Sequence, residues 1–491
     1  MTSPHREAHD VSAPTIHDLP VGIDATGTRT ETDLLGAVPV PADRYWGAQT
    51  QRALARVGID DDRIPAQVYH AYGYVKKAAA VINGRAGRLP RWMVDVIARV
   101  ADEVIAGELD SEFPLSLWQM GGGTQPNTNV NEVMANRAIQ LAGGQLGAKT
   151  PVHPEDHVNL GQSANDTFPT AMHIAAVTAL ADDLLPAAIR LHDATAERSR
   201  QWDGVLKVGR THLADAAPLT VGQEWSGYAT QLEDAVTDVD AAKARLLRLA
   251  LGGTAVGTGL NAPPGFGPDT ANLIAELTGR PFVPAANKFA AQASLDALVR
   301  TSAALRGLAV ALYKFANDVR WLASGPRAGL GELRLPREEP VCASMPGKIN
   351  PAEAETMLMV CIQVIGYDTG VAMAGSAGNF ELNPFRPLVI HNVLRSARLL
   401  AGVADYFREF LVEGVQLNDD KLRHDVDRSV ALVTALSPVI GHDRAAEIAR
   451  LALDNDLPPR AAALARGVGE DLYDRIVVPA NLAHPGAADR G

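Results

Sequence analysis

Two runs of apolar residues at helical spacing constrain the fold of this chain more than any other feature of its sequence. Apolar positions recur every three or four residues across residues 221–249 and again across residues 295–322. This period predicts two α-helices, each about 45 Å long at about 1.5 Å per residue. Helices this long pack into a bundle or a subunit interface rather than standing alone. The positions are Trp225, Tyr228, Leu232, Val236, Val239, Ala242, Leu246 and Leu249 in the first run, and Leu295, Leu298, Ser302, Leu305, Leu308, Leu312, Phe315, Val319 and Leu322 in the second.

The composition also favours helices. Apolar residues make up 47% of the 491 residues and aromatic residues only 5%, so the core must be built from Ala, Leu and Val. Strands favour aromatic and β-branched residues, whereas this mixture suits closely packed helices. A third helix is predicted after Pro351, with apolar positions at Met357, Val360 and Val364, and short periodic segments after about residue 420 predict a small separate helical unit. We therefore expect an all-α chain.

Charge and cysteine content exclude several classes of protein. Acidic residues outnumber basic ones by 57 to 45 without any basic run, which argues against a nucleic-acid surface. Two cysteines, Cys342 and Cys361, are too few for a disulfide framework. The sequence has no uncharged apolar stretch of about 18 residues, so no membrane span is expected. Residues 1–33 lack periodicity and the apolar core of a signal sequence, which predicts a disordered tail on a cytoplasmic protein.

Polar loops precede several helical patterns. They are GGGTQPNTN at residues 121–129, GQSANDTFP at residues 161–169, GRTHL at residues 209–213 and PVCASMPGKINPAEAE at residues 340–355. Helix N-termini bind anions through unpaired N–H groups and the positive end of the dipole, so these loops indicate a small anionic ligand. Taken singly, each has an ordinary structural role as a glycine turn, a helix cap, a hydrogen-bonded histidine or a solvated lysine.

Longer segments resemble the fumarase/aspartase superfamily, and class II fumarase in particular. The segment MPGKINPAEAE at residues 345–355 resembles the superfamily signature Gly-Ser-Ser-x-Met-Pro-x-Lys-x-Asn followed by a glutamate. The similar segments extend from about Thr30 to the C-terminus and occur in the same order as in the family. The other segments are VPADRYWGAQTQRAL, GGGTQPNTNVNEVMANRA, HPEDHVN, GRTHLADAAPLTVGQE, LALGGTAVGTGLN, KFANDVRWLASGPRAGLGE and GNFELNPFRP.

The resemblance implies a nearly all-α architecture of three domains. An N-terminal domain is expected over residues 34–162, a central bundle of long helices over residues 163–419 and a small C-terminal domain over residues 420–491. The family forms homotetramers whose bundles combine into a 20-helix core, with each active site built from three chains. The resemblance implies a small dicarboxylate substrate and neither a metal nor an organic cofactor.

The reaction implied is a reversible anti elimination or addition on a succinyl skeleton, by default fumarate plus water to malate. Removing the weakly acidic proton beside a carboxylate requires fixed cations and N–H donors that stabilise an aci-carboxylate dianion. By resemblance, Lys348, Asn350 and Thr211 hold that carboxylate. His212, backed by Glu355, handles the proton on the leaving-group side through a water. The remaining predicted substrate-binding positions are Gly122, Gly123, Thr124, Ser163, Ala164, Asn165 and Ala343.

The sequence departs from the family at four pocket positions. The serine of the family's glycine loop is Gly122 here, and the second serine of its Ser-Ser-Asn segment is Ala164. The two serines of the signature loop are Cys342 and Ala343. Cys342 occupies the position of the catalytic base, and a thiol ionises more readily than a hydroxyl, so we predict that it abstracts the carbon-bound proton. A small residue filling the serine's space in an inactive site is the alternative.

Two further points stay open. His153, Glu155 and Asp156 resemble the family's second dicarboxylate site, in which the residue at position 155 is usually Asn. The leaving group is also not fixed by the sequence. Besides fumarate hydration, the chain could release fumarate from a succinate carrying ammonia, nitrite or an amine, or it could bind a dicarboxylate without turnover. The retained charged groups favour a working lyase.

Overall fold

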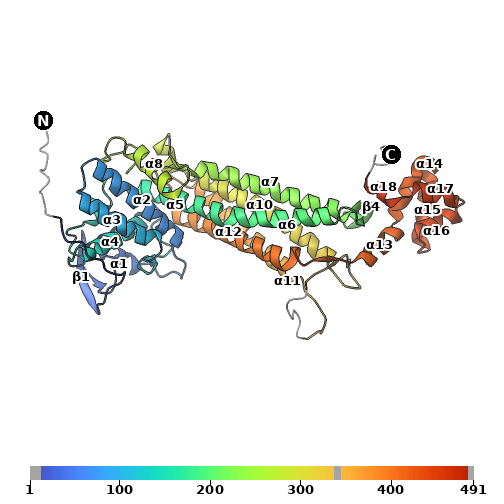
Figure 1. The fold of residues 1–491 in the computed structure, drawn as a ribbon, viewed down its shortest axis with the longest axis horizontal. Helices are drawn as coiled ribbons and strands as arrows, with labels where there is room; N and C mark the ends of the chain where they lie inside the picture. The colour runs from blue at the N-terminus through green and yellow to red at the C-terminus, as the bar shows by residue number, and fades with distance from the viewer. Residues whose placement is uncertain (1–12, 337–343, 485–491) are drawn as a thin grey trace. The chain divides into compact units, whose positions relative to one another are not determined.

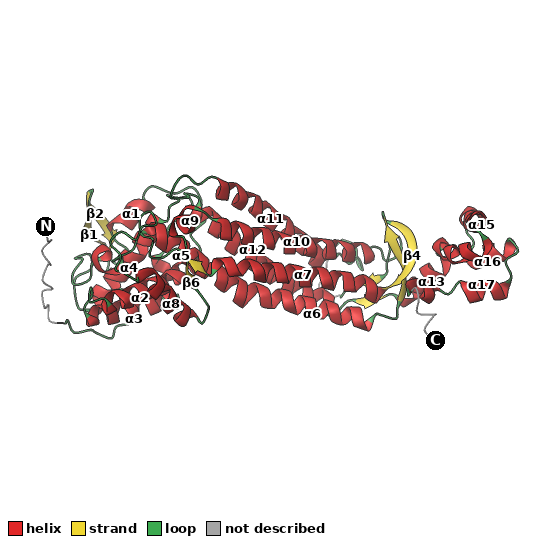
Figure 2. Ribbon diagram, turned by 90° about the horizontal axis from the view of Figure 1, so that it is seen from above, coloured by secondary structure: helices red, strands yellow, loops and turns green. Residues whose placement is uncertain are grey.

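The computed structural model describes residues 13–336 and 344–484, and helices dominate it (Figure 1, Figure 2). Strands in the described residues form only two-stranded sheets, so the predicted all-α fold class is confirmed. The α-helices are α1 (Ala48–Leu54), α2 (Ala66–Arg85), α3 (Arg91–Ile105), α4 (Thr124–Leu141), α5 (Ala164–Thr178), α6 (Leu185–Gln201), α7 (Val221–Leu246), α8 (Phe266–Thr278), α9 (Lys288–Ala293), α10 (Asp296–Leu322), α11 (Ala352–Ser376), α12 (Arg386–Phe407), α13 (Asp419–Arg428), α14 (Ser437–Ile440), α15 (His442–Asp454), α16 (Pro459–Ala465), α17 (Glu470–Ile476) and α18 (Pro479–Ala483).

The remaining elements are short. The strands are β1 (Thr28–Asp33), β2 (Gly36–Pro41), β3 (Leu206–Thr211), β4 (Ala214–Thr220), β5 (Arg248–Leu249), β6 (Val283–Pro284), β7 (Leu333–Arg334) and β8 (Gln416–Leu417). They pair as β1–β2, β3–β4, β5–β6 and β7–β8, and β5–β6 is the parallel pair among them. Short segments of 3-10 or π-helix are η1 (Asp110–Glu112), η2 (Pro154–Val158), η3 (Ala179–Leu184), η4 (Arg408–Val412) and η5 (Val430–Leu436).

The chain divides into two compact units, and the long helices α7, α10, α11 and α12 contribute residues to both. The first unit comprises the described residues up to Asp183 together with Val239–Leu305 and Ile365–Arg398. The second comprises Leu184–Asp238, Arg306–Val364 and the described residues from Leu399 onward. The sequential domain boundaries expected from the resemblance remain predictions.

In the first unit, α2 is the central helix and packs against α3, α5 and α8. Its small residues allow this close approach. A Cβ at Gly73 of α2 would lie 2.6 Å from the Ile105 side chain, so only glycine fits there without a shift. The alanine-rich composition therefore sets the short spacing between helices.

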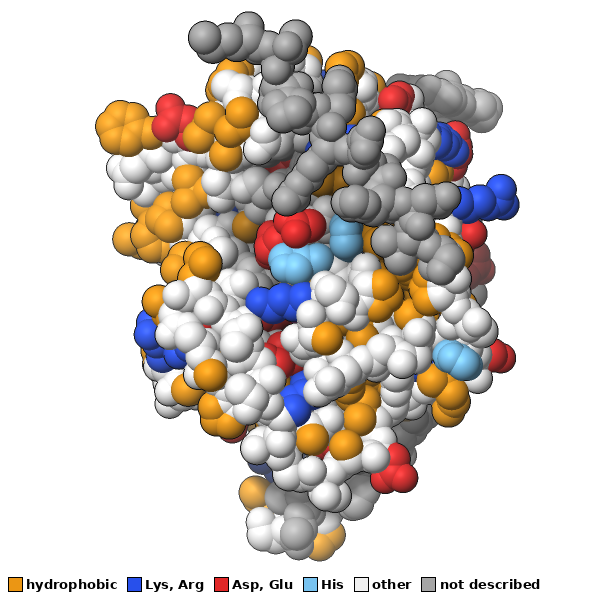
Figure 3. All heavy atoms as spheres, turned by 90° about the vertical axis from the view of Figure 1, so that its left-hand side faces the viewer, with side chains coloured by type: hydrophobic (Ala, Val, Ile, Leu, Met, Phe, Trp, Pro, Cys, Tyr) orange, Lys and Arg blue, Asp and Glu red, His pale blue; other side chains and the backbone are white. Residues whose placement is uncertain are grey.

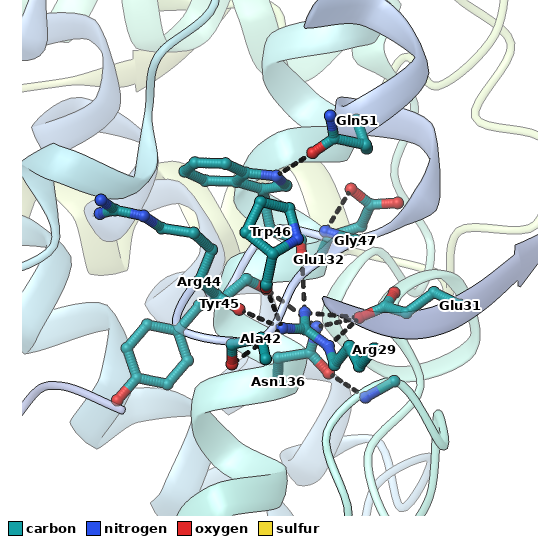
Figure 4. A network of polar contacts seen from close by, with 12 residues as sticks. Arg29, Glu31, Ala42, Arg44, Tyr45, Trp46, Gly47, Gln51, Glu132 and Asn136 are labelled. Carbon is teal, nitrogen blue, oxygen red and sulfur yellow. Dashed lines mark hydrogen bonds and ion pairs between the residues drawn. The ribbon is translucent and has the colours of Figure 1, made fainter. Parts of the chain in front are cut away.

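The β1–β2 hairpin is tied to α4 by a buried network around Arg29 (Figure 4). Arg29 forms an ion pair with Glu31 (Nη2 to Oε1, 2.6 Å). Asn136 of α4 donates a hydrogen bond to the same Glu31 oxygen (3.2 Å). Glu132, also on α4, accepts hydrogen bonds from three backbone N–H groups at the start of α1. A carboxylate at this position caps the helix and complements its dipole.

The predicted disordered tail over residues 1–33 is wrong for its second half. Strand β1 lies within that segment, and the chain preceding β1 is held by hydrogen bonds. Arg137 of α4 donates to the carbonyl oxygens of Leu19 (2.7 Å) and Pro20 (3.1 Å). The segment lacks a periodic apolar face because its partner is a buried arginine rather than an apolar core. Residues 1–12 lie outside the described residues.

The long helices predicted from periodicity are confirmed as α7, α10 and α11. In the second unit, the Phe315 ring of α10 lies 5.4 Å from the Trp225 ring of α7 and 5.3 Å from the Phe407 ring of α12. In the first unit, Ser302 of α10 donates to Asp368 of α11 (2.7 Å). The helices thus run side by side, as Figure 1 and Figure 2 show.

The C-terminal residues form a small apolar core of their own. Leu436, Ile448, Ala462 and Tyr473 are buried together, and they come from η5, α15, α16 and α17. Helices α15 and α16 cover the two short periodic segments that the sequence predicted after residue 420.

Helix α11 is unusually apolar. Among the described residues it is the one helix long and apolar enough to cross a membrane, with a mean hydropathy of 1.5 over its most apolar 18 residues. Core helices of bundles share that length and composition, so a single such helix is a weak indication of a span. Met359 and Ile362, with exposed fractions of 63% and 59%, belong to a face of α11 that this one chain does not cover.

Candidate active site

The glycine loop before α4 places Gly122, Gly123 and Thr124 together. Gly123 is the N-cap of α4 and has a φ of 86°, a conformation that favours glycine. Thr124 begins the helix and is exposed. Arg386, which is completely buried, donates to the carbonyl oxygen of Gly122 (3.0 Å) and fixes the loop from within the first unit.

The N-terminus of α5 brings together Ser163, Ala164 and Asn165. Ser163 is the N-cap, and its hydroxyl accepts a hydrogen bond from the Asn165 N–H (3.2 Å). Asp166 accepts one from the Ser163 N–H (2.9 Å), which completes a capping box. The capping role considered from the sequence is therefore present. The Asn165 side-chain amide donates to the carbonyl oxygen of Ala255 (2.7 Å).

Asp166 also ties the α5 N-terminus to a glycine-rich loop. Its second carboxylate oxygen accepts hydrogen bonds from the N–H groups of Gly252 and Thr254, both at 2.9 Å. Burial raises the pKa of Asp166, whereas these backbone hydrogen bonds and the charge of Lys76 lower it. One buried carboxylate therefore holds the N-terminus of α5 against a loop that belongs to the LALGGTAVGTGLN segment of the family resemblance.

His212 lies at the tip of the β3–β4 hairpin in the second unit. His212 and Leu213 form a two-residue turn with φ values of 56° and 60°, between Thr211 and Ala214, which pair across the strands. Non-glycine residues rarely adopt positive φ, and such conformations cluster at functional sites. The sequence placed residues 209–213 in a loop before a helix, and the structure instead places them in a strand and its turn.

The hairpin is supported by a chain of buried charges. Lys207 of β3 pairs with Glu332 (2.7 Å) and with Glu224, and Arg210 pairs with the other oxygen of Glu332 (2.5 Å). Tyr228 donates to Glu224 (3.2 Å). Burial raises the pKa of Tyr228, as do the charges of Glu224 and Asp318. These ion pairs fix β3 and hence the turn that presents His212.

Thr211, His212 and Leu213 line an open cavity of about 1020 Å³ within the second unit. Lys207, Arg210, Glu224 and Tyr228 line it as well. The cavity therefore combines a histidine, a hydroxyl and several fixed charges in one place.

The signature loop contributes exposed groups to the second unit. Lys348 is exposed, Asn350 is half-buried, and Glu355 is exposed in the first turn of α11. The Lys348 N–H donates to the carbonyl oxygen of Met345 (3.1 Å), which closes a turn before the helix. Cys342 and Ala343 lie outside the described residues.

The segment expected to form a second dicarboxylate site is a single π-helical turn, η2. His153 is its N-cap, and its Nδ1 accepts hydrogen bonds from the N–H groups of Glu155 (3.1 Å) and Asp156 (3.0 Å). Glu155 accepts hydrogen bonds from Asn131 (3.3 Å) and Asn159 (2.8 Å). His153 and Glu155 line a small cavity of about 50 Å³. The Asp156 side chain is largely exposed.

Sequence reasoning did not single out Lys76 or Arg386. Lys76 lies on the apolar face of α2, four residues after Tyr72 and three before Ala79, and a lysine within such a face is a signal for a buried cation. Arg386 belongs to the GNFELNPFRP segment of the family resemblance. Both side chains are completely buried in the first unit.

The predicted site residues therefore fall into two groups. The first unit holds the groups at the N-termini of α4 and α5, and the second unit holds the histidine hairpin and the described part of the signature loop. Figure 3 shows one face of the molecule, on which Lys and Arg side chains form small separate patches among acidic and histidine side chains.

Comparison with known proteins identifies the family. The lyase family matches residues 36–366, and the family described as the fumarase C C-terminus matches residues 432–484. The chain belongs to the class II fumarate hydratases. The fumarate hydratase class II of Methanosarcina acetivorans is 60% identical over 96% of this chain and 97% of its own length. That of Thermosynechococcus vestitus is 53% identical over 92% of this chain and 97% of its own length.

Solved structures agree with this assignment. The crystal structure of a class II fumarase from Schistosoma mansoni matches with a TM-score of 0.91 and 39% identity, covering 94% of this chain and all of the other. The resemblance inferred from sequence segments is thereby confirmed across nearly the whole chain.

Proposed function

We propose that this chain catalyses the reversible hydration of fumarate to malate. The observation that carries the proposal is the high identity, over nearly full length, to proteins named fumarate hydratase class II. The geometry supports it. Two helix N-termini with exposed or half-buried hydroxyl and amide groups in the first unit, and an exposed lysine and histidine in the second, are the groups that a small dicarboxylate requires.

In this reaction the carbon-bound proton of malate is removed first, which leaves an aci-carboxylate, and the C–O bond then breaks to release water. Lys348 and Asn350, with Thr211, would hold the aci-carboxylate, and fixed donors of this kind stabilise developing charge. His212, supported by Glu355, would give the leaving hydroxyl its proton through a water. Thr124, Ser163 and Asn165 would bind the other carboxylate.

The base that removes the carbon-bound proton is assigned from the sequence alone. Cys342 stands six residues before Lys348, where the family has its catalytic serine. The unperturbed pKa of a thiol is about 8.5, and nearby cations lower it, so a thiolate is accessible near neutral pH.

The assembly would be a homotetramer. Met359 and Ile362 of α11 are exposed, and so are Val310 and Trp321 of α10. Exposed apolar side chains along long helices need a partner surface, and further copies of the same helices supply one. Active sites shared by three chains would follow from this assembly.

The decisive experiment measures turnover of fumarate, malate and a panel of succinates carrying an amine, nitro or other group at carbon 2. The absorbance of fumarate reports each reaction. Turnover of malate with inactive Lys348→Met and an unchanged unfolding midpoint would support the proposal. Turnover restricted to the C–N substrates would replace it with a C–N lyase. Saturable binding without any turnover would make the chain a dicarboxylate-binding homologue.

A further inference from the structure

Gly122 differs from the two glycines beside it, because no contact with the described residues requires it to be glycine. A Cβ at Gly121 would lie 1.3 Å from the Pro384 carbonyl oxygen, and one at Gly123 would lie 2.3 Å from the Phe168 ring. At Gly122 the nearest atoms would be Leu382 Cδ2 at 3.5 Å and Thr124 Oγ1 at 3.9 Å, which are ordinary contacts. Its φ is also not positive.

Gly122 therefore leaves room for a methyl-sized group in a buried loop. Leu382 bounds that space on one side with an apolar methyl group, and the Thr124 hydroxyl bounds it on another. A serine here would place a hydroxymethyl group in this space. Glycine leaves the same volume empty and lined in part by carbon.

The loop itself is held rigidly, so it cannot collapse into this space. Arg386 donates to the Gly122 carbonyl oxygen (3.0 Å) and to the Gln292 carbonyl oxygen (2.6 Å). The Asn379 and Leu382 backbones exchange two hydrogen bonds, which hold the backbone that carries the Leu382 side chain.

We propose that the space beside Gly122 admits an alkyl group on the substrate, so that the enzyme hydrates fumarates bearing a short alkyl branch, such as methylfumarate. The proposal rests on the proposed function, since it places the branch at the pocket end formed by Thr124. A methyl group against Leu382 gains apolar contact, whereas a serine hydroxymethyl at position 122 would collide with it. The absence of a hydroxyl at position 122 thus lowers the affinity for fumarate and makes room for a larger substrate.

The chemistry is unchanged by the branch. Water adds across the C=C bond, so one carbon gains the hydroxyl oxygen and the other gains a proton, and the product is a hydroxysuccinate carrying the same alkyl group. No oxidant or further reactant is needed.

The test compares kcat/KM for fumarate and methylfumarate in the full chain, in Gly122→Ser and Gly122→Ala, and in Gly469→Ser as the matched control. A Cβ at Gly469, the N-cap of α17, meets nothing within 4 Å. One methylene group in an apolar pocket changes specificity by about tenfold or more. We expect Gly122→Ser to lower the ratio of kcat/KM for methylfumarate to kcat/KM for fumarate by at least about tenfold, mainly by raising the KM for methylfumarate. Gly122→Ala should lower it less, and the control should leave it unchanged.

The outcomes separate the two proposals. This inference is overturned if the wild type hydrates fumarate but not methylfumarate. It is also overturned if a folded Gly122→Ser keeps the wild-type ratio of the two kcat/KM values. In both cases the proposed function stands. Failure of Gly122→Ser to fold also overturns this inference, because the vacant space would then not exist. Failure to hydrate either compound overturns the proposed function, and this inference falls with it.

Discussion

Lys76 is a buried lysine that donates hydrogen bonds to three side-chain amides. Its Nζ donates to Asn127 (2.8 Å), Asn159 (3.0 Å) and Gln162 (3.0 Å). Asn127 belongs to α4, and Asn159 and Gln162 lie in the segment between η2 and α5. One buried amino group therefore holds α4 and the chain that leads into Ser163. Burial lowers the pKa of Lys76 to about 7, although the charges of Glu155 and Asp166 raise it.

This pKa makes stability depend on pH in a predictable direction. Between pH 7 and about 10.4, the folded chain has lost the Lys76 proton and the unfolded chain has kept it, so raising the pH favours the folded state. We expect the free energy of unfolding of the wild type to rise relative to that of Lys76→Met by up to about 1.4 kcal/mol per pH unit in this window. Denaturant unfolding at several pH values measures the difference. Lys77→Met removes the neighbouring lysine, which is paired with Asp102, and leaves Lys76 in place. The free energy of unfolding of this variant should therefore change with pH as that of the wild type does. Parallel curves for Lys76→Met would show that the buried amine keeps its proton.

Cys342 gives a second prediction at the scale of one residue. If its thiolate is the base, turnover should rise with pH along the titration of a thiol and disappear on alkylation, with substrate protecting. Cys342→Ala should be inactive, whereas Cys342→Ser should turn over malate because it restores the family's hydroxyl. Cys361 is buried, and burial raises its pKa to about 12, so Cys361→Ala provides the control for alkylation. Full activity in Cys342→Ala would exclude the thiol from the chemistry.

At the scale of elements, the β3–β4 hairpin governs where His212 lies. Leu213 has a φ of 60° with a 70% exposed side chain, so its identity affects the turn rather than a core. Asn tolerates this conformation and a β-branched residue does not. We expect Leu213→Asn to keep turnover and Leu213→Val to lose about 100-fold in kcat, because a displacement of about 1 Å costs that much. Circular dichroism should show the same helix content in both variants. Equal turnover in the two would mean that the turn does not position the histidine.

Elements differ in how far the sequence predicts them. Helices α7 and α10 were predicted from periodicity, because apolar residues at every third or fourth position identify the buried face of a helix from its own segment alone. The hairpin was missed because its support is not local. Lys207 pairs with Glu332, far along the chain, and nothing in the segment around Lys207 identifies that partner. The same holds for the residues before β1, whose anchor is Arg137 on α4.

The candidate site shows the same division. Motif resemblance named the residues at the N-termini of α4 and α5, because hydroxyl and amide groups in short loops leave a recognisable spacing. It did not name Arg386, which acts through a backbone carbonyl group and so leaves no motif at the position it holds. Nor could it distinguish Gly122 from Gly121 and Gly123, since the reason for each glycine lies in its neighbours in space.

At the scale of the whole molecule, the exposed face of α11 predicts assembly. Met359 and Ile362 are three residues apart and Met373 follows eleven residues after Ile362, so all three lie near one side of the helix. Small or polar residues occupy the exposed positions between Ile362 and Met373, namely Gln363, Gly366, Thr369 and Ala372. A face of this kind lets another helix approach closely and buries apolar area on contact.

We expect light scattering at micromolar concentration to give the mass of four chains for the wild type. Ile362→Asp should yield smaller species, because a carboxylate buried in an apolar interface has no partner. The substitution lies on a side chain that is exposed in the single chain, so the helix content of the dissociated protein should be retained. Leu453→Asp, at an exposed apolar position on α15, should remain a tetramer. If active sites are shared between chains, turnover in Ile362→Asp should fall with the tetramer fraction as the protein is diluted. A wild-type monomer with full turnover would contradict both the assembly and the shared site.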